Sequence, residues 1–293
     1  MKKPGLKTEI FLWILFFAAI AAVGQYLVPA EERQAAPVRE VRIGYVSWAE
    51  GVAMTYLAQA VLEERMGYEV SLTMADPAPI FTSLAEGNLD FFLDAWLPVT
   101  HQRHMEKYRD ALVDLGYNYR GARIGLVTPV DVKVETIPDL REHGTRFNNV
   151  ITGIDSGAGI MEATRRAIDR YGLDMQLISS SGAAMTASLK DAVESRRPIV
   201  VTGWKPHWMF ARWDLKFLED PQGVYGEVEN IHTMARPGIS QDMPEVANFF
   251  RAFRFTDQQI GSLMDAMNQA ESQPDAAHRW MKDHQELIES WLK

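Results

Sequence analysis

Three tryptophans stand in local sequences that could bind a cation. They are Trp48 in Gly44-Tyr-Val-Ser-Trp-Ala-Glu50, Trp96 in Leu93-Asp-Ala-Trp-Leu-Pro-Val-Thr-His101, and Trp204 in Thr202-Gly-Trp-Lys-Pro-His-Trp208. Tryptophan holds a cation against its ring face better than any other side chain. Three converging indoles would therefore make a box for a quaternary ammonium group, which has no N–H to donate. A single tryptophan is more often a packing residue, so this chemistry depends on whether the fold brings the three together.

A glycine-containing turn could supply the opposite, anion-binding chemistry. Asp155-Ser-Gly-Ala-Gly-Ile160 opens a predicted helix, whose first N–H groups are free to take an anion. Gly159 would let a carboxylate approach the main chain closely. The alternative is a tight strand-to-helix turn with no ligand. A dinucleotide fingerprint is excluded because Glu162 stands where a third glycine is needed, and the Lys-Ser/Thr pair of a P-loop is missing.

Two ionisable side chains lie close to the tryptophans in sequence. His101 follows Trp96 by five residues, and Glu50 follows Trp48 by two. His101 and His104 are spaced as on one helical turn, which is a weak metal hint, but no third ligand is nearby and we expect no metal site. Exposed acids such as Glu50 are usually solvated, although this one could face the cavity. Enzyme signatures are lacking, so we expect neither catalytic residues nor a cofactor.

The elements that must position these residues alternate between strand and helix. The pattern predicts strands over 41–46, 68–73, 89–94, 121–129, 149–155, 176–179 and 198–202. It predicts helices over 53–65, 78–84, 160–170, 183–195, 244–253, 257–270 and 274–291. Strands separated by helices imply parallel βαβ units, an open α/β sheet and, because the series occurs twice, two lobes.

All three tryptophan motifs and the glycine turn follow predicted strands. Ligands of open α/β sheets bind at the carboxyl ends of the strands, so we expect all of these motifs to lie at the same edge of the sheet. This placement is the reason to group them into one candidate site. Packing roles are expected for Trp208, Trp213, Trp280 and Trp291.

Composition excludes several classes of function. The 293 residues are 47% hydrophobic, which is enough for a sizeable core. The net charge of −9 argues against nucleic acid, because there is no basic stripe to neutralise phosphates. The absence of cysteine excludes disulfides, Cys-ligated zinc, iron–sulfur clusters and thiol nucleophiles.

The N-terminal segment has the pattern of an export signal. Lys2, Lys3 and Lys7 precede an apolar run from Ile10 to Val23. We expect residues 1–30 to be a signal peptide or an uncleaved signal anchor, and residues 31–39 to be a linker. A buried core helix is the alternative. The export interpretation places the body of the protein, residues 40–293, in the periplasm or elsewhere outside the cytoplasm. An uncleaved N-terminal segment would tether it to the inner membrane.

Five ordered motifs together resemble the substrate-binding proteins of ABC importers for glycine betaine and related quaternary amines. The resemblance covers residues 40–293. The motifs are Gly44-Tyr-Val-x-Trp48, Ala95-Trp-Leu-Pro-x-Thr-His101, Gly153-Ile-Asp-Ser-Gly-x-Gly-Ile-Met161, Ala184-Met-Thr-Ala-x-Leu-Lys190 and Gly203-Trp-x-Pro-His-Trp-Met-Phe210.

The resemblance implies a two-lobed periplasmic-binding-protein fold, type II-like, with the ligand cleft between the lobes. It places lobe A over about 40–127 plus 236–293, and lobe B over about 128–235. It further implies a non-enzymatic receptor that captures glycine betaine or a related quaternary ammonium zwitterion. This receptor, which we expect to be a monomer, would deliver the ligand to a membrane permease and its ATPase, for osmoprotection or nutrient uptake.

The resemblance also assigns roles to the candidate residues. It implies that Trp48, Trp96 and Trp204 surround the trimethylammonium group, and that His101 and the main-chain N–H groups of Gly159 and Ile160 hold the carboxylate. Choline-binding relatives have an acidic residue near the position of Glu50, so a choline or carnitine receptor is an alternative. A membrane-anchored sensor or scaffold domain is another, and an enzyme acting on a betaine-like substrate is a third.

Overall fold

The structure is a computed structural model that describes residues 39–293. The predicted signal segment 1–30 and residues 31–38 of the predicted linker lie outside the described residues. Over residues 39–293, no helix combines the length and the hydropathy that a bilayer crossing requires.

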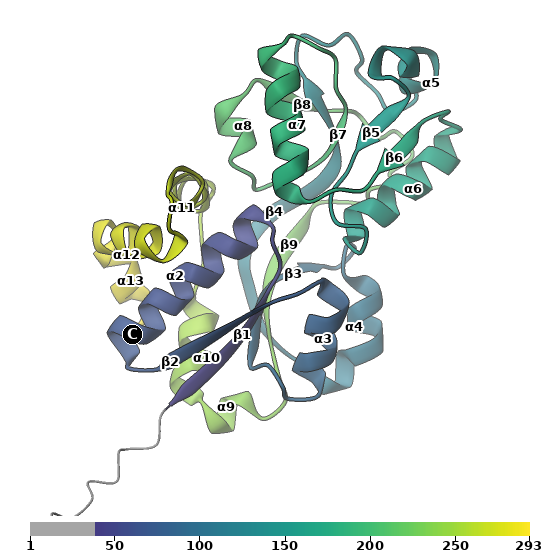
Figure 1. Cartoon of the computed structure of the whole chain (residues 1–293). Helices are drawn as coiled ribbons and strands as arrows, with labels where there is room; N and C mark the ends of the chain where they lie inside the picture. Colours follow the sequence, from purple (N-terminus) through teal and green to yellow (C-terminus); the bar gives the residue numbers. More distant parts are fainter. Residues whose placement is uncertain (1–38) are drawn as a thin grey trace, which may run out of the picture. The chain divides into compact units, whose positions relative to one another are not determined.

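The first lobe begins with the alternation that the sequence predicts (Figure 1). In chain order its elements are β1 (Glu40–Tyr45), α2 (Ala49–Met66), β2 (Glu69–Met74), α3 (Pro77–Ala85) and β3 (Phe91–Leu97). Strand β1 pairs in parallel with both β2 and β3, as expected of βαβ units. Helix α2 ends at Gly67, whose φ of 72° is the left-handed conformation that glycine adopts without strain.

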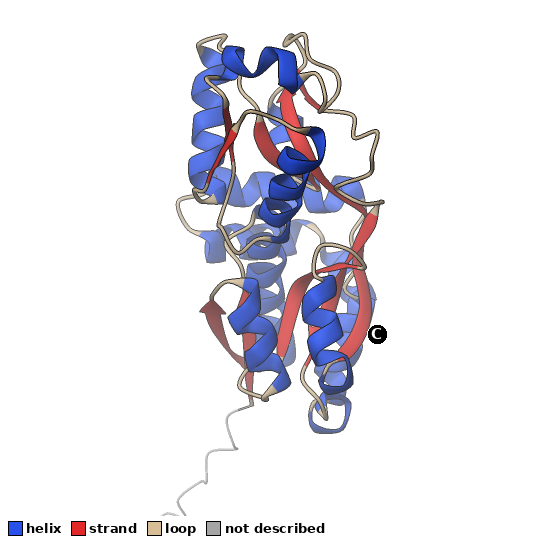
Figure 2. Cartoon of the chain, turned by 90° about the vertical axis from the view of Figure 1, so that its right-hand side faces the viewer, coloured by secondary structure: helices blue, strands red, loops and turns tan. Residues whose placement is uncertain are grey.

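The second lobe repeats this arrangement (Figure 1). Its parallel strands are β5 (Val150–Thr152), β6 (Gln176–Ile178) and β7 (Val201–Lys205), with α6 (Gly159–Tyr171) and α7 (Gly182–Glu194) between them. In both lobes helices cover the two sides of the strands (Figure 2). The short strand β8 (Leu215–Phe217) follows the short helix α8 (Met209–Arg212).

Two antiparallel strands join the lobes. Strand β4 (Val113–Pro129) pairs with β9 (Glu229–Ala235) as far as Ala122, and with β7 from Arg123 onward. The sheet is therefore mixed: the predicted parallel units are present, and antiparallel pairs join them. The physical reason is that the chain crosses between the lobes along β4 and returns to pair β9 between β3 and β4.

Strand β4 is also about twice the length of the predicted strand 121–129, because its first part finds a partner in β9, which the sequence pattern did not reveal. Strand pairing changes from one lobe to the other at Ala122 and Arg123, and the chain has returned by Glu229. The lobe limits near residues 127 and 235 stay a prediction.

The C-terminal segment is helical, as predicted, and packs on α2 of the first lobe. Its helices are α9 (Ile239–Asp242), α10 (Pro244–Ala252), α11 (Asp257–Gln269), α12 (Gln273–Asp283) and α13 (Gln285–Trp291). The predicted helix 274–291 is divided at His284, which has non-helical backbone angles. Trp280 and Trp291 are buried here, in the packing role expected of them.

One buried carboxylate on β9 holds the loop that follows β3. Glu229 accepts hydrogen bonds from the backbone N–H groups of Val99 and Thr100, each at 2.6 Å, and from the Thr100 hydroxyl. Only 1% of Glu229 is exposed, so its carboxyl group is buried at this part-buried contact. This contact fixes the start of α4 (Gln102–Tyr108) and the residues just before it.

We expect Glu229→Ala to lower the free energy of unfolding by about 2 kcal/mol, because two part-buried N–H donors and the Thr100 hydroxyl lose their acceptor. Urea unfolding followed by circular dichroism measures the change. Glu227→Ala removes an exposed acid from the same segment and is the matched control. Equal stability of the two variants would contradict the role given to Glu229.

Candidate ligand-binding site

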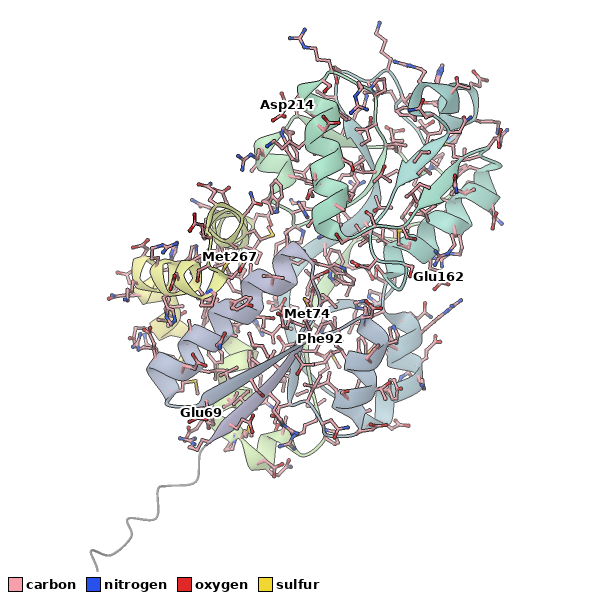
Figure 3. All side chains as sticks on the ribbon, in the orientation of Figure 1. Glu69, Met74, Phe92, Glu162, Asp214 and Met267 are labelled. Carbon is pink, nitrogen blue, oxygen red and sulfur yellow. The ribbon has the colours of Figure 1, made fainter. Side chains whose placement is uncertain are left out.

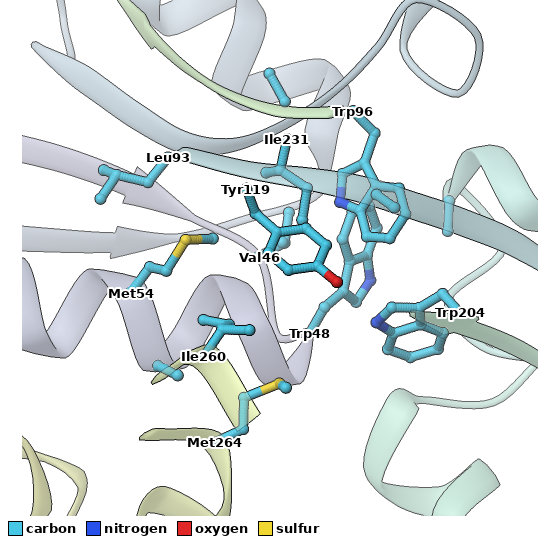
Figure 4. Packing of buried hydrophobic residues seen from close by; sticks show 14 of the residues in the cluster. Val46, Trp48, Met54, Leu93, Trp96, Tyr119, Trp204, Ile231, Ile260 and Met264 are labelled. Atoms are coloured by element: carbon cyan, nitrogen blue, oxygen red, sulfur yellow. The ribbon is translucent and has the colours of Figure 1, made fainter. Parts of the chain in front are cut away.

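The three tryptophans line one cavity between the lobes. Trp48 and Trp96 come from the first lobe and Trp204 from the second, and Figure 4 shows them side by side. They are 6%, 2% and 3% exposed. The cavity has about 20 Å³ of space for water, and its other walls are Glu50, Thr100, Ile124, Ile154, Ala158, Gly159 and Ile160. The convergence predicted from the sequence is present.

Each tryptophan is placed by a different backbone feature. Trp48 is the extended residue that precedes α2. Trp96 lies on β3 opposite Ile231, and Trp204 lies on β7 opposite Ile124. The expectation that all three follow strands holds for Trp48 alone. Trp96 and Trp204 lie within their strands because antiparallel pairing with β9 and β4 extends β3 and β7 past their predicted ends.

Two buried carboxyl groups fix the indole rings. The Trp204 Nε1–H donates to Glu50 Oε2 at 2.7 Å, and the Trp96 Nε1–H donates to Asp94 Oδ1 at 2.8 Å. The first of these bonds joins the two lobes. The sequence had already placed Glu50 among the candidates, and it is a fully buried wall of the cavity.

Asp94 is the partner that the sequence analysis missed. A usable signal was present, since residues two apart on a strand point to the same face and Asp94 stands two before Trp96. Burial raises the pKa of Asp94 to about 7. Burial, and then the charge of Asp94, raises the pKa of Glu50 well above its usual range.

His101 lies beside the cavity and contacts its wall. Its ring lies nearly parallel to Trp48, with 5.8 Å between centroids and 13° between planes. Its Nδ1 accepts the backbone N–H of Trp96 at 2.9 Å, which places the proton of the neutral ring on Nε2. Burial, helped by the nearby His104, lowers the His101 pKa to about 3, so the ring stays neutral. Its Nε2 is buried with no hydrogen-bond partner among the described residues.

The glycine turn meets the first lobe across the cavity. Gly159 is the first residue of α6, one position earlier than the predicted helix start, and Ile160 follows it into the cavity wall. A Cβ on Gly159 would lie 2.6 Å from the carbonyl oxygen of Thr100. Glycine is therefore required for this approach of the lobes, and the first N–H groups of α6 have no intrahelical partner.

Charged contacts at the rim also join the lobes. Arg103 on α4 pairs with Glu162 on α6 at 2.8 Å, and Figure 3 labels Glu162 at this edge of the second lobe. Lys205 on β7 pairs with Asp257 on α11 at 2.7 Å. Together with the Glu50–Trp204 bond, these contacts describe a closed arrangement of the lobes around the cavity.

His101 and His104 lie close together, with 5.9 Å between their ring centroids. Within residues 39–293, no three His, Cys, Asp or Glu side chains gather as metal ligands would. His104 instead lies flat against Phe81, with 4.8 Å between the ring centroids.

Sequence comparison gives the family. The profile of the substrate-binding domain of the ABC-type glycine betaine transport system matches residues 39–283. The chain belongs to this family. A glycine betaine/carnitine transport binding protein of Listeria monocytogenes is 46% identical over 154 residues, which are 52% of this chain and 51% of that protein. The chain thus spans about half the length of this curated relative.

Solved structures of the family share the two-lobed fold. Lactococcal OpuAC in its closed conformation with glycine betaine is 36% identical, with a TM-score of 0.82 over 87% of this chain and all of that one. The glycine betaine/L-proline-binding protein ProX of Borrelia burgdorferi is 34% identical, with a TM-score of 0.83 over 87% and 97% of the chains. A choline-binding protein with choline is 27% identical, with a TM-score of 0.80 over 86% and 91%.

For this betaine-family chain, we expect Gly159→Ala to prevent full closure, because the new methyl group would collide with the Thr100 main chain. Ligand affinity should fall at least about tenfold, while thermal unfolding of the empty protein stays nearly unchanged. Isothermal titration and small-angle scattering with and without ligand measure the two effects.

Gly182→Ala is the matched control. Gly182 is likewise the first residue of a second-lobe helix, but its Cβ would lie 3.9 Å from Trp204, an ordinary contact. If Gly159→Ala binds and closes as Gly182→Ala does, the proposed need for glycine at the contact is wrong.

Proposed function

We propose that this protein is the receptor of an ABC importer and captures glycine betaine or a related quaternary ammonium zwitterion between its lobes. The observation that carries the proposal is the cavity between the lobes, where three indoles face a helix start. A zwitterion would touch both lobes, so it would stabilise the closed arrangement over the open one.

The cationic end of the ligand fits the indole walls. A trimethylammonium group cannot donate N–H hydrogen bonds, but the faces of aromatic rings attract it. Each cation–ring contact contributes about 2 kcal/mol of binding free energy where water is excluded. The carboxyl group of Glu50 is a wall of the same cavity and would attract the cation when it is ionised. All three indoles are almost fully buried, so the attraction would act with little screening.

The carboxylate end fits the opposite pole. The N–H groups of Gly159 and Ile160 open α6, where the helix dipole favours an anion. His101 offers a neutral Nε2–H that has no partner among the described residues. These donors would share the carboxylate without a full positive charge, which suits a ligand whose net charge is zero.

A choline or carnitine receptor is the second candidate. Its support is Glu50, a buried acid in the cavity wall that could balance a ligand with a net positive charge. Choline has no carboxylate, so it would leave the donors at His101 and α6 unused. That cost favours a betaine-type ligand.

The remaining parts of the proposal concern the setting of the protein. It acts outside the cytoplasm as a monomer without catalysis and hands its ligand to a permease driven by a cytoplasmic ATPase. The family supports the transport role, and the basic, apolar segment 1–30 supports export. A membrane-anchored sensor using the same lobes is the alternative if that segment is retained.

We expect Trp96→Ala to weaken glycine betaine binding at least about tenfold, because one desolvated cation–ring contact is lost. Isothermal titration measures the affinity, and thermal unfolding of the empty protein reports on its fold. Trp213→Ala is the control, since Trp213 is half-buried against Trp208 and is not a wall of the cavity. Unchanged affinity in Trp48, Trp96 and Trp204 alanine variants would exclude the cation box.

For the anionic pole, we expect His101→Ala to reduce glycine betaine affinity at least about tenfold more than choline affinity, because only glycine betaine has a carboxylate for Nε2–H. The ratio of the two affinities corrects for any general loosening near Trp96. Equal losses for both ligands would show that His101 supports the site without binding the carboxylate.

A further inference from the structure

Two buried carboxyl groups lie together at the cationic end of the cavity. Glu50 comes from α2 and Asp94 from β3, with 0% and 1% exposure. Gly51, which follows Glu50 in the chain, lies so close to β3 that a Cβ there would be 2.4 Å from Asp94 Oδ2. Two acids that are independent of each other in sequence are therefore neighbours in the interior.

Each carboxyl group has only one of its oxygens satisfied. Glu50 Oε2 and Asp94 Oδ1 accept the two indole N–H groups. The second oxygens, Glu50 Oε1 and Asp94 Oδ2, are buried with no hydrogen-bond partner among the described residues. Two bare carboxylates in this position would be costly, whereas a retained proton neutralises one and turns an acceptor into a donor.

No basic side chain of the described residues forms an ion pair with Glu50 or Asp94, and the facing groups offer no other counter-charge. His101 stays neutral, and burial lowers the pKa of His104 as well. From β4, the Tyr119 hydroxyl donates to Asp257, which also pairs with the exposed Lys205 of β7. In the turn before α6, Asp155 Oδ2 is also buried with no hydrogen-bond partner among the described residues.

We propose that Glu50 and Asp94 hold one proton between them and present a single negative charge to the bound cation, so that capture is linked to pH. This inference rests on the proposed function, because the quaternary ammonium group is the missing counter-charge. Asp94 then has a positioning role: it holds the Trp96 ring and sets the charge of Glu50, without lining the cavity itself.

The direction of the pH dependence follows from this charge. In acid the pair is neutral and offers the cation nothing beyond the ring faces. As the pH rises, the first proton leaves and the pair becomes an anion, which the ligand stabilises. Binding at acidic pH must therefore release up to one proton, and affinity must increase with pH until the empty pair has ionised. The second proton is retained because two adjacent charges repel.

Burial places this ionisation near neutral pH. It raises the pKa of Asp94 to about 7, and the pKa of Glu50 lies well above its ordinary value. An isolated surface acid would already be ionised at pH 5 and would show no such dependence. The linkage should therefore fall within a range where the protein can be studied folded.

The test is isothermal titration with glycine betaine and with choline between about pH 5 and pH 8.5, in buffers of different ionisation enthalpy. Neither ligand gains or loses a proton in this range. We expect affinity to rise by up to about tenfold per pH unit on the acidic side and to level off near neutral pH, with proton release on binding disappearing at the plateau.

Asp94→Asn is the decisive variant. Its amide oxygen can still accept the Trp96 Nε1–H, and its NH₂ group can donate to Glu50 as the retained proton would. We expect the rise in affinity of this variant to begin at a lower pH than in the parent protein, because Glu50 then ionises without a neighbouring acid. His104→Gln removes a neighbouring titratable group and should leave the profile in place.

Each outcome decides one of the two proposals. A flat pH profile without proton release, an unshifted profile in Asp94→Asn, or an equal loss of affinity at every pH in that variant overturns the proton-sharing pair. Failure of the parent protein to bind glycine betaine, choline or carnitine at any pH overturns the proposed function itself. Binding with a flat profile would leave the function standing and remove only the linkage to pH.

Discussion

The hydrogen bond from the Trp204 indole to Glu50 is the interaction on which the site depends. It joins the second lobe to the first at 2.7 Å and holds a cavity wall in place. It also requires a carboxyl group to be fully buried, at a cost that the described residues do not offset with a basic partner. The site is consequently incomplete by itself, and a cation is the chemical group that would complete it.

The contacts that join the two lobes supply little attraction by themselves. The rim pairs Arg103–Glu162 and Lys205–Asp257 are largely exposed, and such pairs contribute little in water. The absence of a side chain at Gly159 lets the main chain of Thr100 come close, but this contact adds no attraction between the lobes. In the proposed function, the free energy of closure comes from the ligand, which would contact indoles at one end and helix N–H groups at the other.

The fold prepares these groups before any ligand arrives. Glu229 on β9 holds the segment that leads into His101, and His101 in turn accepts the Trp96 N–H. The segment 96–101 thus carries three groups of the site in fixed positions. They are the Trp96 ring, the Thr100 carbonyl oxygen at the contact between the lobes, and the unpartnered Nε2–H of His101. Such prior ordering lowers the entropy that binding would otherwise cost.

The sequence by itself determined the components of the site and their address. Tryptophan chemistry is local to the residue, and strand-helix alternation follows hydrophobic periodicity, so Trp48, Trp96, Trp204 and the turn at Gly159 could be grouped from their order alone. The helix starts were predicted to within a few residues, and Glu50 was recognised as a group that could face the cavity.

Only the tertiary structure decided which strands pair and which side chains contact the site residues. Strand β9 lies more than a hundred residues from β3 in sequence, so no local pattern could show that it would lengthen β4 or place Glu229 under Thr100. The closeness of Asp94 to Glu50, the protonated nitrogen of His101 and the bond between the lobes likewise depend on contacts between distant elements. Charge state is set by burial and neighbours, and neither exists until the chain has folded.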